Sequence, residues 1–103
     1  MSEGVTAALE AMRADAKTWE DAASDLTQPK ETVAGLTVEP AQVGMHAVDA
    51  GLDKTYEEAR AAIEAMIKKA ENYFNKLSTD LTDSANQYES DDQSAQEELN
   101  STQ

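Results

Sequence analysis

The sequence predicts an all-α fold in which two long amphipathic helices form an antiparallel hairpin. Apolar residues recur at steps of three and four over two long stretches of the chain, which is the spacing of one helix face. Alanine, the strongest helix former, occurs 18 times, whereas valine and isoleucine together occur only 7 times. Residues that favour turns gather between the two stretches, namely Gly35, Pro40, Gly44 and Gly51. The order is therefore helix, connector, helix.

The first helix is expected over about residues 4–34. Its apolar positions alternate steps of four and three without interruption, which is the pattern of a packed seam. Pro29 removes one main-chain hydrogen bond, so the helix should bend near that position. Gly35 is then expected to end the helix in the left-handed conformation. The seam comprises Val5, Leu9, Met12, Ala16, Trp19, Ala23 and Leu26.

The connector, residues 35–51, is expected to contain one short helix that begins at Pro40 and ends near Ala50. The second long helix is expected over about residues 52–90, and Ile67 and Phe74 widen its apolar stripe. We expect residues 1–92 to form the helical hairpin and residues 93–103 to form a flexible acidic tail. The second seam comprises Leu52, Tyr56, Ala59, Ile63, Met66, Ala70, Tyr73, Leu77, Leu81, Ser84 and Tyr88.

The length of the two helices predicts self-association or a partner of similar shape. At 1.5 Å per residue the helices would be about 46 and 56 Å long. A hairpin of two such helices has no interior and leaves the flanks of each stripe in water. A homodimer, or a complex with a similar helical hairpin, would cover them as a four-helix bundle.

Charge excludes some partners. The chain of 103 residues carries 21 acidic and 8 basic side chains, a net charge of −13, which repels nucleic acids and anionic membranes. No apolar window approaches the roughly 18 residues of a membrane span, so we expect no membrane insertion. The N-terminal sequence has neither the basic nor the apolar region of a secretory signal peptide.

The residues do not predict an enzyme, and we expect no catalytic, cofactor-binding or metal-ligating residue. No phosphate-binding loop or activated-nucleophile motif is present in the sequence. His46 and Asp49 could share a metal ion if their stretch is helical, but metal sites need three or four ligands. Acidic pairs such as Glu57 with Glu58 point about 100° apart on a helix, which indicates solvated charge.

Three residues are candidates for protein contact. Trp19, the single tryptophan, lies in the first seam among small residues. It either fills the core opposite the second helix or forms the edge of a groove for a partner. Tyr88 and Asp92 are four residues apart at the start of the acidic tail, so both would project from one face if the helix continues.

These residues resemble the small Trp-X-Gly (WXG) proteins of the type VII, or ESX, secretion system, and most closely their actinobacterial secretion-associated branch. The resemblance covers about residues 5–92, although Trp19-Glu20-Asp21 lacks the glycine of the family motif. It is carried by the stretch from Leu9 to Leu26, by Gly35-Leu36-Thr37-Val38, Gly51-Leu52 and Tyr56, and by Tyr88-Glu89 followed by the acidic pair Asp91-Asp92.

The resemblance implies a helical hairpin that dimerises into a four-helix bundle and is exported folded, without a cleavable signal peptide, after synthesis in the cytoplasm. The export signal would be Tyr88 and Asp92, with Trp19 as a possible further part of it. The partners would be the secretion ATPase or a chaperone. The alternative is a cytosolic acidic helical adaptor, or an inhibitor that mimics nucleic acid, for which the net charge is the argument.

Overall fold

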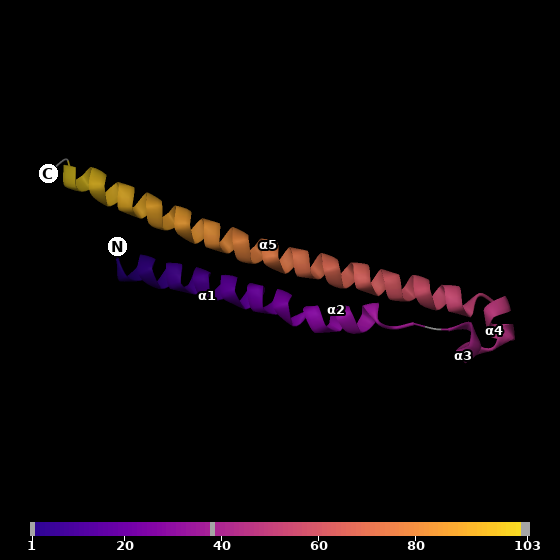
Figure 1. The fold of residues 1–103 in the computed structure, drawn as a ribbon. Helices are drawn as coiled ribbons and strands as arrows, with labels where there is room; N and C mark the ends of the chain where they lie inside the picture. Colours follow the sequence, from indigo (N-terminus) through magenta and orange to yellow (C-terminus); the bar gives the residue numbers. More distant parts are fainter. Residues whose placement is uncertain (1, 38, 102–103) are drawn as a thin grey trace. The chain divides into compact units, whose positions relative to one another are not determined.

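The computed structural model describes residues 2–37 and 39–101, and these residues confirm the all-α prediction. They form helices and connecting turns, and no strand occurs among them. No helix in these residues is both long enough and apolar enough to cross a membrane. The described residues form five helices in succession (Figure 1): α1 (Glu3–Asp25), α2 (Thr27–Ala34), α3 (Pro40–Val43), α4 (Met45–Asp49) and α5 (Leu52–Ser101).

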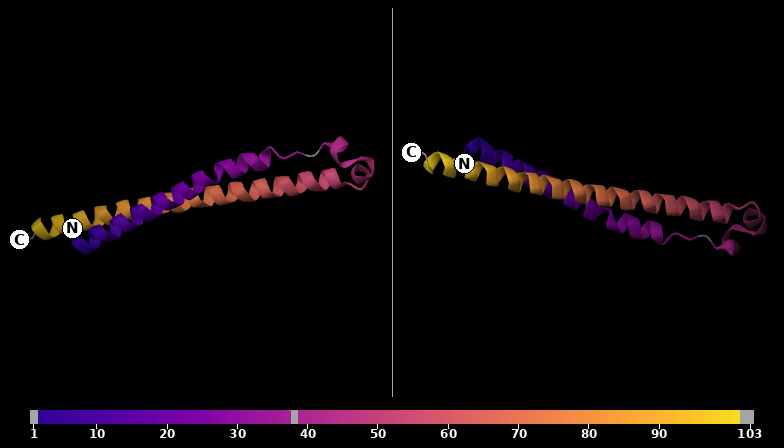
Figure 2. Two further views of the ribbon diagram at one scale, coloured as in Figure 1. Left: turned by 90° about the horizontal axis from the view of Figure 1, so that it is seen from below. Right: turned by 90° about the horizontal axis from the view of Figure 1, so that it is seen from above.

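The chain divides into two compact units. The terminal unit consists of Met1–Ala22 with Tyr73–Gln103, and the central unit consists of Ala23–Asn72. Each unit pairs an N-terminal helical segment with a segment of α5, and the views in Figure 2 show these pairs from two further sides.

Both pairs run antiparallel. In the terminal unit, Arg13 contacts Glu89 whereas Trp19, further along α1, contacts Phe74. In the central unit, Lys30 contacts Glu71, whereas Leu36, further along the chain, borders a pocket with Tyr56. In each unit, residues further along the N-terminal segment therefore contact earlier residues of α5.

Helix α1 confirms the predicted first seam. The Ser2 hydroxyl accepts a hydrogen bond from the Val5 amide at 3.1 Å, which satisfies one of the free donors at the start of the helix. Leu9, Ala16 and Ala23 are buried at 2, 4 and 3% exposure. The other seam members, Val5, Met12, Trp19 and Leu26, are half-buried, so this face is the one that packs.

The expected single helix over residues 4–34 is interrupted at Leu26, which separates α1 from α2. Pro29 accounts for this break. It has no amide hydrogen to donate to the carbonyl of Asp25, and its ring crowds that carbonyl. The Leu26 amide instead bonds the Ala23 carbonyl at 3.2 Å, which tightens the last turn of α1. Pro29 itself lies in the first turn of α2. Main-chain amides of a first turn have no acceptor within their own helix, so α2 loses no hydrogen bond to the proline.

The connector holds two short helices where one was expected. Gly44 has a φ of 82°, a value that side chains rarely allow, and it separates α3 from α4. Gly51, with a φ of 80°, follows α4 and precedes α5. The left-handed conformation expected at Gly35 is wrong: its φ is −81°, and it caps α2 by donating to the Glu31 carbonyl at 3.0 Å.

Helix α5 extends beyond the expected end near residue 90 and reaches Ser101. Residues 93–101, where a flexible tail was expected, lie within this helix. No glycine or proline occurs between Leu52 and Ser101 to stop the helix. Side-chain hydrogen bonds one turn apart support its last third, from Gln87 to Asp91 at 2.9 Å and from Gln96 to Asp92 at 3.4 Å.

The predicted seam on α5 is displaced by part of a turn from the face that packs. Ile63, Met66 and Tyr73 were expected inside, yet they are 48, 68 and 62% exposed. Ile67 and Phe74 are half-buried, and Ala85 is fully buried. The apolar arc of α5 is wider than one neighbouring helix can cover, so only one edge of it is enclosed.

Charged side chains complete the packed face of α5 in the central unit. Lys30 donates to Glu71 at 2.8 Å, and the two side chains are only 32 and 16% exposed. Arg60 lies between Glu57 and Glu64, one turn away on either side, and donates to both carboxylates at 3.2 and 2.8 Å. The hydrogen bond to Glu57, and then that to Glu64, raise the pKa of Arg60 from its ordinary value.

Candidate functional site

Tyr88 and Asp92, the candidate export residues, both lie within α5 and are separated by one helical turn. Residues four positions apart share a helix face. The Tyr88 side chain is 64% exposed. Asp92 is half-buried and accepts the hydrogen bond from Gln96. The structure thus brings the two side chains onto one face, as expected for a helix that continues.

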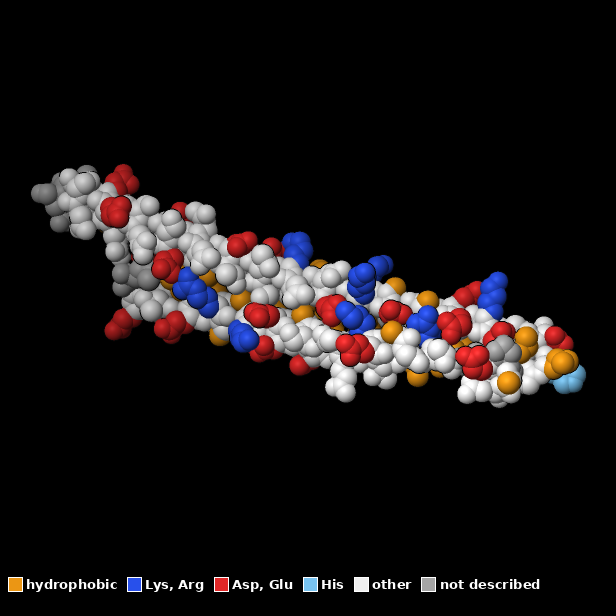
Figure 3. Space-filling view, in the orientation of Figure 1, with side chains coloured by type: hydrophobic (Ala, Val, Ile, Leu, Met, Phe, Trp, Pro, Cys, Tyr) orange, Lys and Arg blue, Asp and Glu red, His pale blue; other side chains and the backbone are white. Residues whose placement is uncertain are grey.

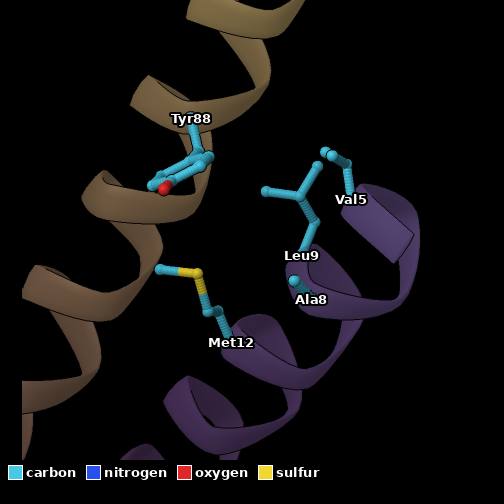
Figure 4. A pocket seen from close by; sticks show the side chains of 5 residues that line it. All are labelled: Val5, Ala8, Leu9, Met12 and Tyr88. Atoms are coloured by element: carbon cyan, nitrogen blue, oxygen red, sulfur yellow. The ribbon is translucent and has the colours of Figure 1, made fainter. Parts of the chain in front are cut away.

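Tyr88 also borders an apolar groove of about 230 Å³ in the terminal unit. The other walls come from α1, and Figure 4 shows the Tyr88 ring across from Val5, Leu9 and Met12. Leu9 is 2% exposed and forms the floor, whereas Ala8 is too small to fill the opening. We call this feature the terminal groove; its lining is Val5, Ala8, Leu9, Met12 and Tyr88.

Arg13 holds α1 to α5 beside the terminal groove. Its Nη2 donates to Glu89 Oε2 at 2.7 Å and to Asn86 Oδ1 at 3.2 Å. Asn86 and Glu89 are three residues apart on one face of α5, so one guanidinium binds both of them next to Tyr88. Arginine suits this role because its donors are fixed in one plane.

Trp19 lies half-buried on α1 and packs against Phe74 of α5. The ring centroids are 5.2 Å apart and the ring planes are tilted by 42°. Tilted aromatic pairs at such distances are favourable beyond the area that they bury. The contact agrees with the core alternative for Trp19, and its place in a partner contact stays a prediction.

Each of the two lysines of the terminal unit forms an ion pair with an acid four residues further along its own helix. Lys17 pairs with Asp21 at 3.0 Å and Lys76 with Asp80 at 2.6 Å. In each pair the hydrogen bond to the carboxylate, and then its charge, raises the pKa of the lysine. With Arg13, every basic side chain of the terminal unit is therefore already paired with a carboxylate.

The two residues considered for a metal ion, His46 and Asp49, lie exposed on α4. Within residues 2–37 and 39–101, no three histidine or acidic side chains gather in a way that could hold a metal ion.

Sequence reasoning singled out Tyr88, Asp92 and Trp19 as candidates but missed the terminal groove and Arg13. A usable signal was present for Arg13. Arg13 comes directly after a residue of the first seam, Met12, and Glu89 comes directly after a residue of the second seam, Tyr88. Charged residues next to seam positions often pair across neighbouring helices. The groove depended on the small size of Ala8 and on which edge of α5 packs, and a spacing pattern reveals neither.

Comparison of the chain with protein-family models, with curated proteins and with solved structures finds no match.

Proposed function

We propose that this protein is a secreted substrate or partner subunit of a type VII secretion system and acts by protein–protein contact. Tyr88 and Asp92 would form its export signal. One observation carries the proposal: the two side chains lie one turn apart on a single face of α5, and most of the tyrosine is accessible. A receptor could therefore contact the phenol and the carboxylate together.

The proposal includes a helical hairpin that dimerises into a four-helix bundle. The antiparallel pairing inside each unit supports the hairpin. In the central unit, α5 presents Leu52, Ile63 and Met66 at 55, 48 and 68% exposure. These positions fall on one side of the helix, and a second pair of helices would remove them from water.

Export of two variants, Tyr88→Ala and Asp92→Ala, tests the signal. Each is expressed in a host with a type VII system, with the secretion ATPase intact or inactivated, and measured in the culture filtrate and in the cells. We expect both variants to accumulate in the cells and to be lost from the filtrate. Wild type should be in the filtrate only when the ATPase is intact.

Matched controls exist on the same helix. Tyr73 is 62% exposed, close to the 64% of Tyr88, and Asp91 is the acid next to Asp92. Tyr73→Ala and Asp91→Ala should be exported like wild type. Normal export of Tyr88→Ala and Asp92→Ala would show that these residues are not the export signal and that their spacing is a chance pattern.

Sedimentation at micromolar concentration tests the bundle. The monomer mass is 11.1 kDa, and a dimer is expected at twice that value. A monodisperse monomer with a cooperative thermal transition would exclude the homodimer and leave a complex with a different helical partner as the remaining form of the proposal.

The net charge of −13 favours a second candidate, an acidic adaptor or nucleic-acid mimic that stays in the cytosol, whereas the distribution of the charge opposes it. The terminal unit carries 12 acidic and 3 basic side chains, against 9 and 5 in the central unit. A mimic should present negative charge along its whole length, whereas here the excess is concentrated in one unit. Retention of wild type in cells with an active ATPase would favour this candidate.

A further inference from the structure

The terminal groove has the shape of a site for a third helix. It is open to solvent and lies between two antiparallel helical segments, with walls from α1 and Tyr88 of α5. Its lining on α1 runs from Val5 to Met12, which spans about 10 Å at 1.5 Å per residue. That is the distance between side chains i and i+7 of a helix, the usual spacing of apolar anchors in a helix-in-groove complex.

The surroundings of the groove are strongly acidic. The three basic side chains of the terminal unit are each bound to a carboxylate of the same unit. Asp91 and Asp92 lie one turn from Tyr88 on α5, and Asp15 lies one turn from Met12 on α1, so these acids share a helix face with groove residues. Figure 3 shows acidic side chains distributed over the visible face of this part of the molecule. An occupant with basic residues beside its apolar anchors would meet complementary charge.

Arg13 gives the groove fixed walls. Its bonds to Asn86 and Glu89, which share one face of α5, tie α5 to α1 beside Tyr88. Side chains that are already held in place lose less freedom when a partner binds.

We propose that the terminal groove binds a basic amphipathic helix of another protein, whose apolar side chains contact Val5, Ala8, Met12 and Tyr88. The inference rests on the proposed function in one respect, because Tyr88 belongs to both sites. The partner that binds the export signal would then be a protein with a basic amphipathic helix. The signal is then a surface built from two helices and is incomplete as a linear motif.

A second copy of this chain fits the groove poorly. Another terminal unit would bring its own excess of acidic side chains to an acidic rim, and like charges held close together oppose binding. A basic helix is attracted by the same rim.

The test uses the full chain labelled with ¹⁵N and three synthetic peptides. The probe is a helical peptide of leucine and lysine, with leucine at positions i, i+3, i+4 and i+7. One control peptide replaces each leucine by alanine and keeps the charge; the other replaces each lysine by glutamate. We expect saturable amide shifts at residues 5–12 and 86–92 with the probe. The alanine peptide should bind about tenfold more weakly, and the glutamate peptide should not bind.

Two variants of α1 localise the contact. Ala8→Lys places a charge in the groove, whereas Ala7→Lys adds the same charge at the preceding residue, which is exposed and outside the groove. Ala8→Lys should weaken binding of the probe about fivefold or more, the loss typical of an interface anchor. Ala7→Lys should leave the affinity within about twofold of wild type. Circular dichroism of both variants checks that the helices persist.

Equal affinity for the leucine and alanine peptides, or equal effects of the two lysine variants, would overturn the groove and leave only general charge attraction. Concentration-dependent shifts at residues 5–12 without peptide would assign the groove to a second copy. Export separates the two proposals. If Tyr88→Ala is retained while Ala8→Lys is exported normally, only the groove fails; if the probe binds but Tyr88→Ala is exported, only the proposed function fails.

Discussion

The rings of Trp19 and Phe74 pack with their centroids 5.2 Å apart and join α1 to α5 inside the terminal unit. Because Trp19 is half-buried, we expect Trp19→Ala to lower the free energy of unfolding by about 2–3 kcal/mol, below the 3–5 kcal/mol of a fully buried tryptophan. Urea denaturation of both proteins measures the difference.

A double-mutant cycle with Phe74→Leu isolates the contact between the two rings. We expect a coupling energy of about 0.5–1.5 kcal/mol, as for other aromatic pairs. A change in export or partner binding from Trp19→Ala, with unchanged stability, would instead make the tryptophan a recognition residue.

The ion pair between Lys30 and Glu71 is the second testable contact. Lys30→Met leaves the Glu71 carboxylate, which is 16% exposed, without its partner and should lower stability by about 1–2 kcal/mol. Adding Glu71→Met should restore stability to within about 1 kcal/mol of wild type, because two apolar side chains can replace a partly buried pair.

The exposed pair of Lys76 and Asp80 is the matched control for this experiment. Lys76→Met should leave the melting temperature unchanged, since exposed ion pairs contribute little. A loss from Lys76→Met as large as that from Lys30→Met would show that burial is not the cause.

Alanine substitutions at two glycines should change the free energy of unfolding in opposite directions. Gly44 and Gly51 have positive φ, and no atom within 4 Å would meet an added Cβ, so alanine at either position is opposed by backbone strain alone. Gly44→Ala should lower stability by about 1–2 kcal/mol. Gly35→Ala should raise it by about 0.4–1 kcal/mol, because φ is −81° and the new Cβ makes only ordinary contacts. Thermal unfolding of the two variants is the measurement.

The length of α5 can be tested at its C-terminal end. We expect positive ¹³Cα secondary shifts through residues 93–101. Gln96→Pro removes a main-chain donor and should reduce these shifts to near zero while Ala85 keeps its own. Shifts near zero for residues 93–101 in wild type would restore the flexible tail.

The first seam could be predicted residue by residue, whereas the second could not. Along α1 the apolar stripe is narrow, so the spacing from Val5 to Leu26 points to one face. Along α5 the stripe is broad, and a spacing rule accepts Ile63 and Ile67 alike. Which of them packs depends on the neighbouring helix, and the structure encloses Ile67 more than Ile63.

The turns and the tail were missed for local reasons. Gly35, Gly44 and Gly51 look alike in sequence, and only the backbone shows which of them has a positive φ. The acidic composition after Tyr88 is typical of disorder, yet glutamine and glutamate are good helix formers and nothing there breaks the helix. The candidate residues Tyr88 and Asp92 could be found by spacing, whereas their α1 neighbours could not.

Because α5 contains no glycine or proline from Leu52 to Ser101, the face that bears Tyr88 and Asp92 is ordered before a partner arrives. A segment that folds on binding loses about 1–2 kcal/mol of backbone entropy for each residue that becomes ordered. Helix α5 avoids that loss, so a small contact area can give useful affinity. Complex formation should then have a small heat-capacity change, set by the buried contact alone.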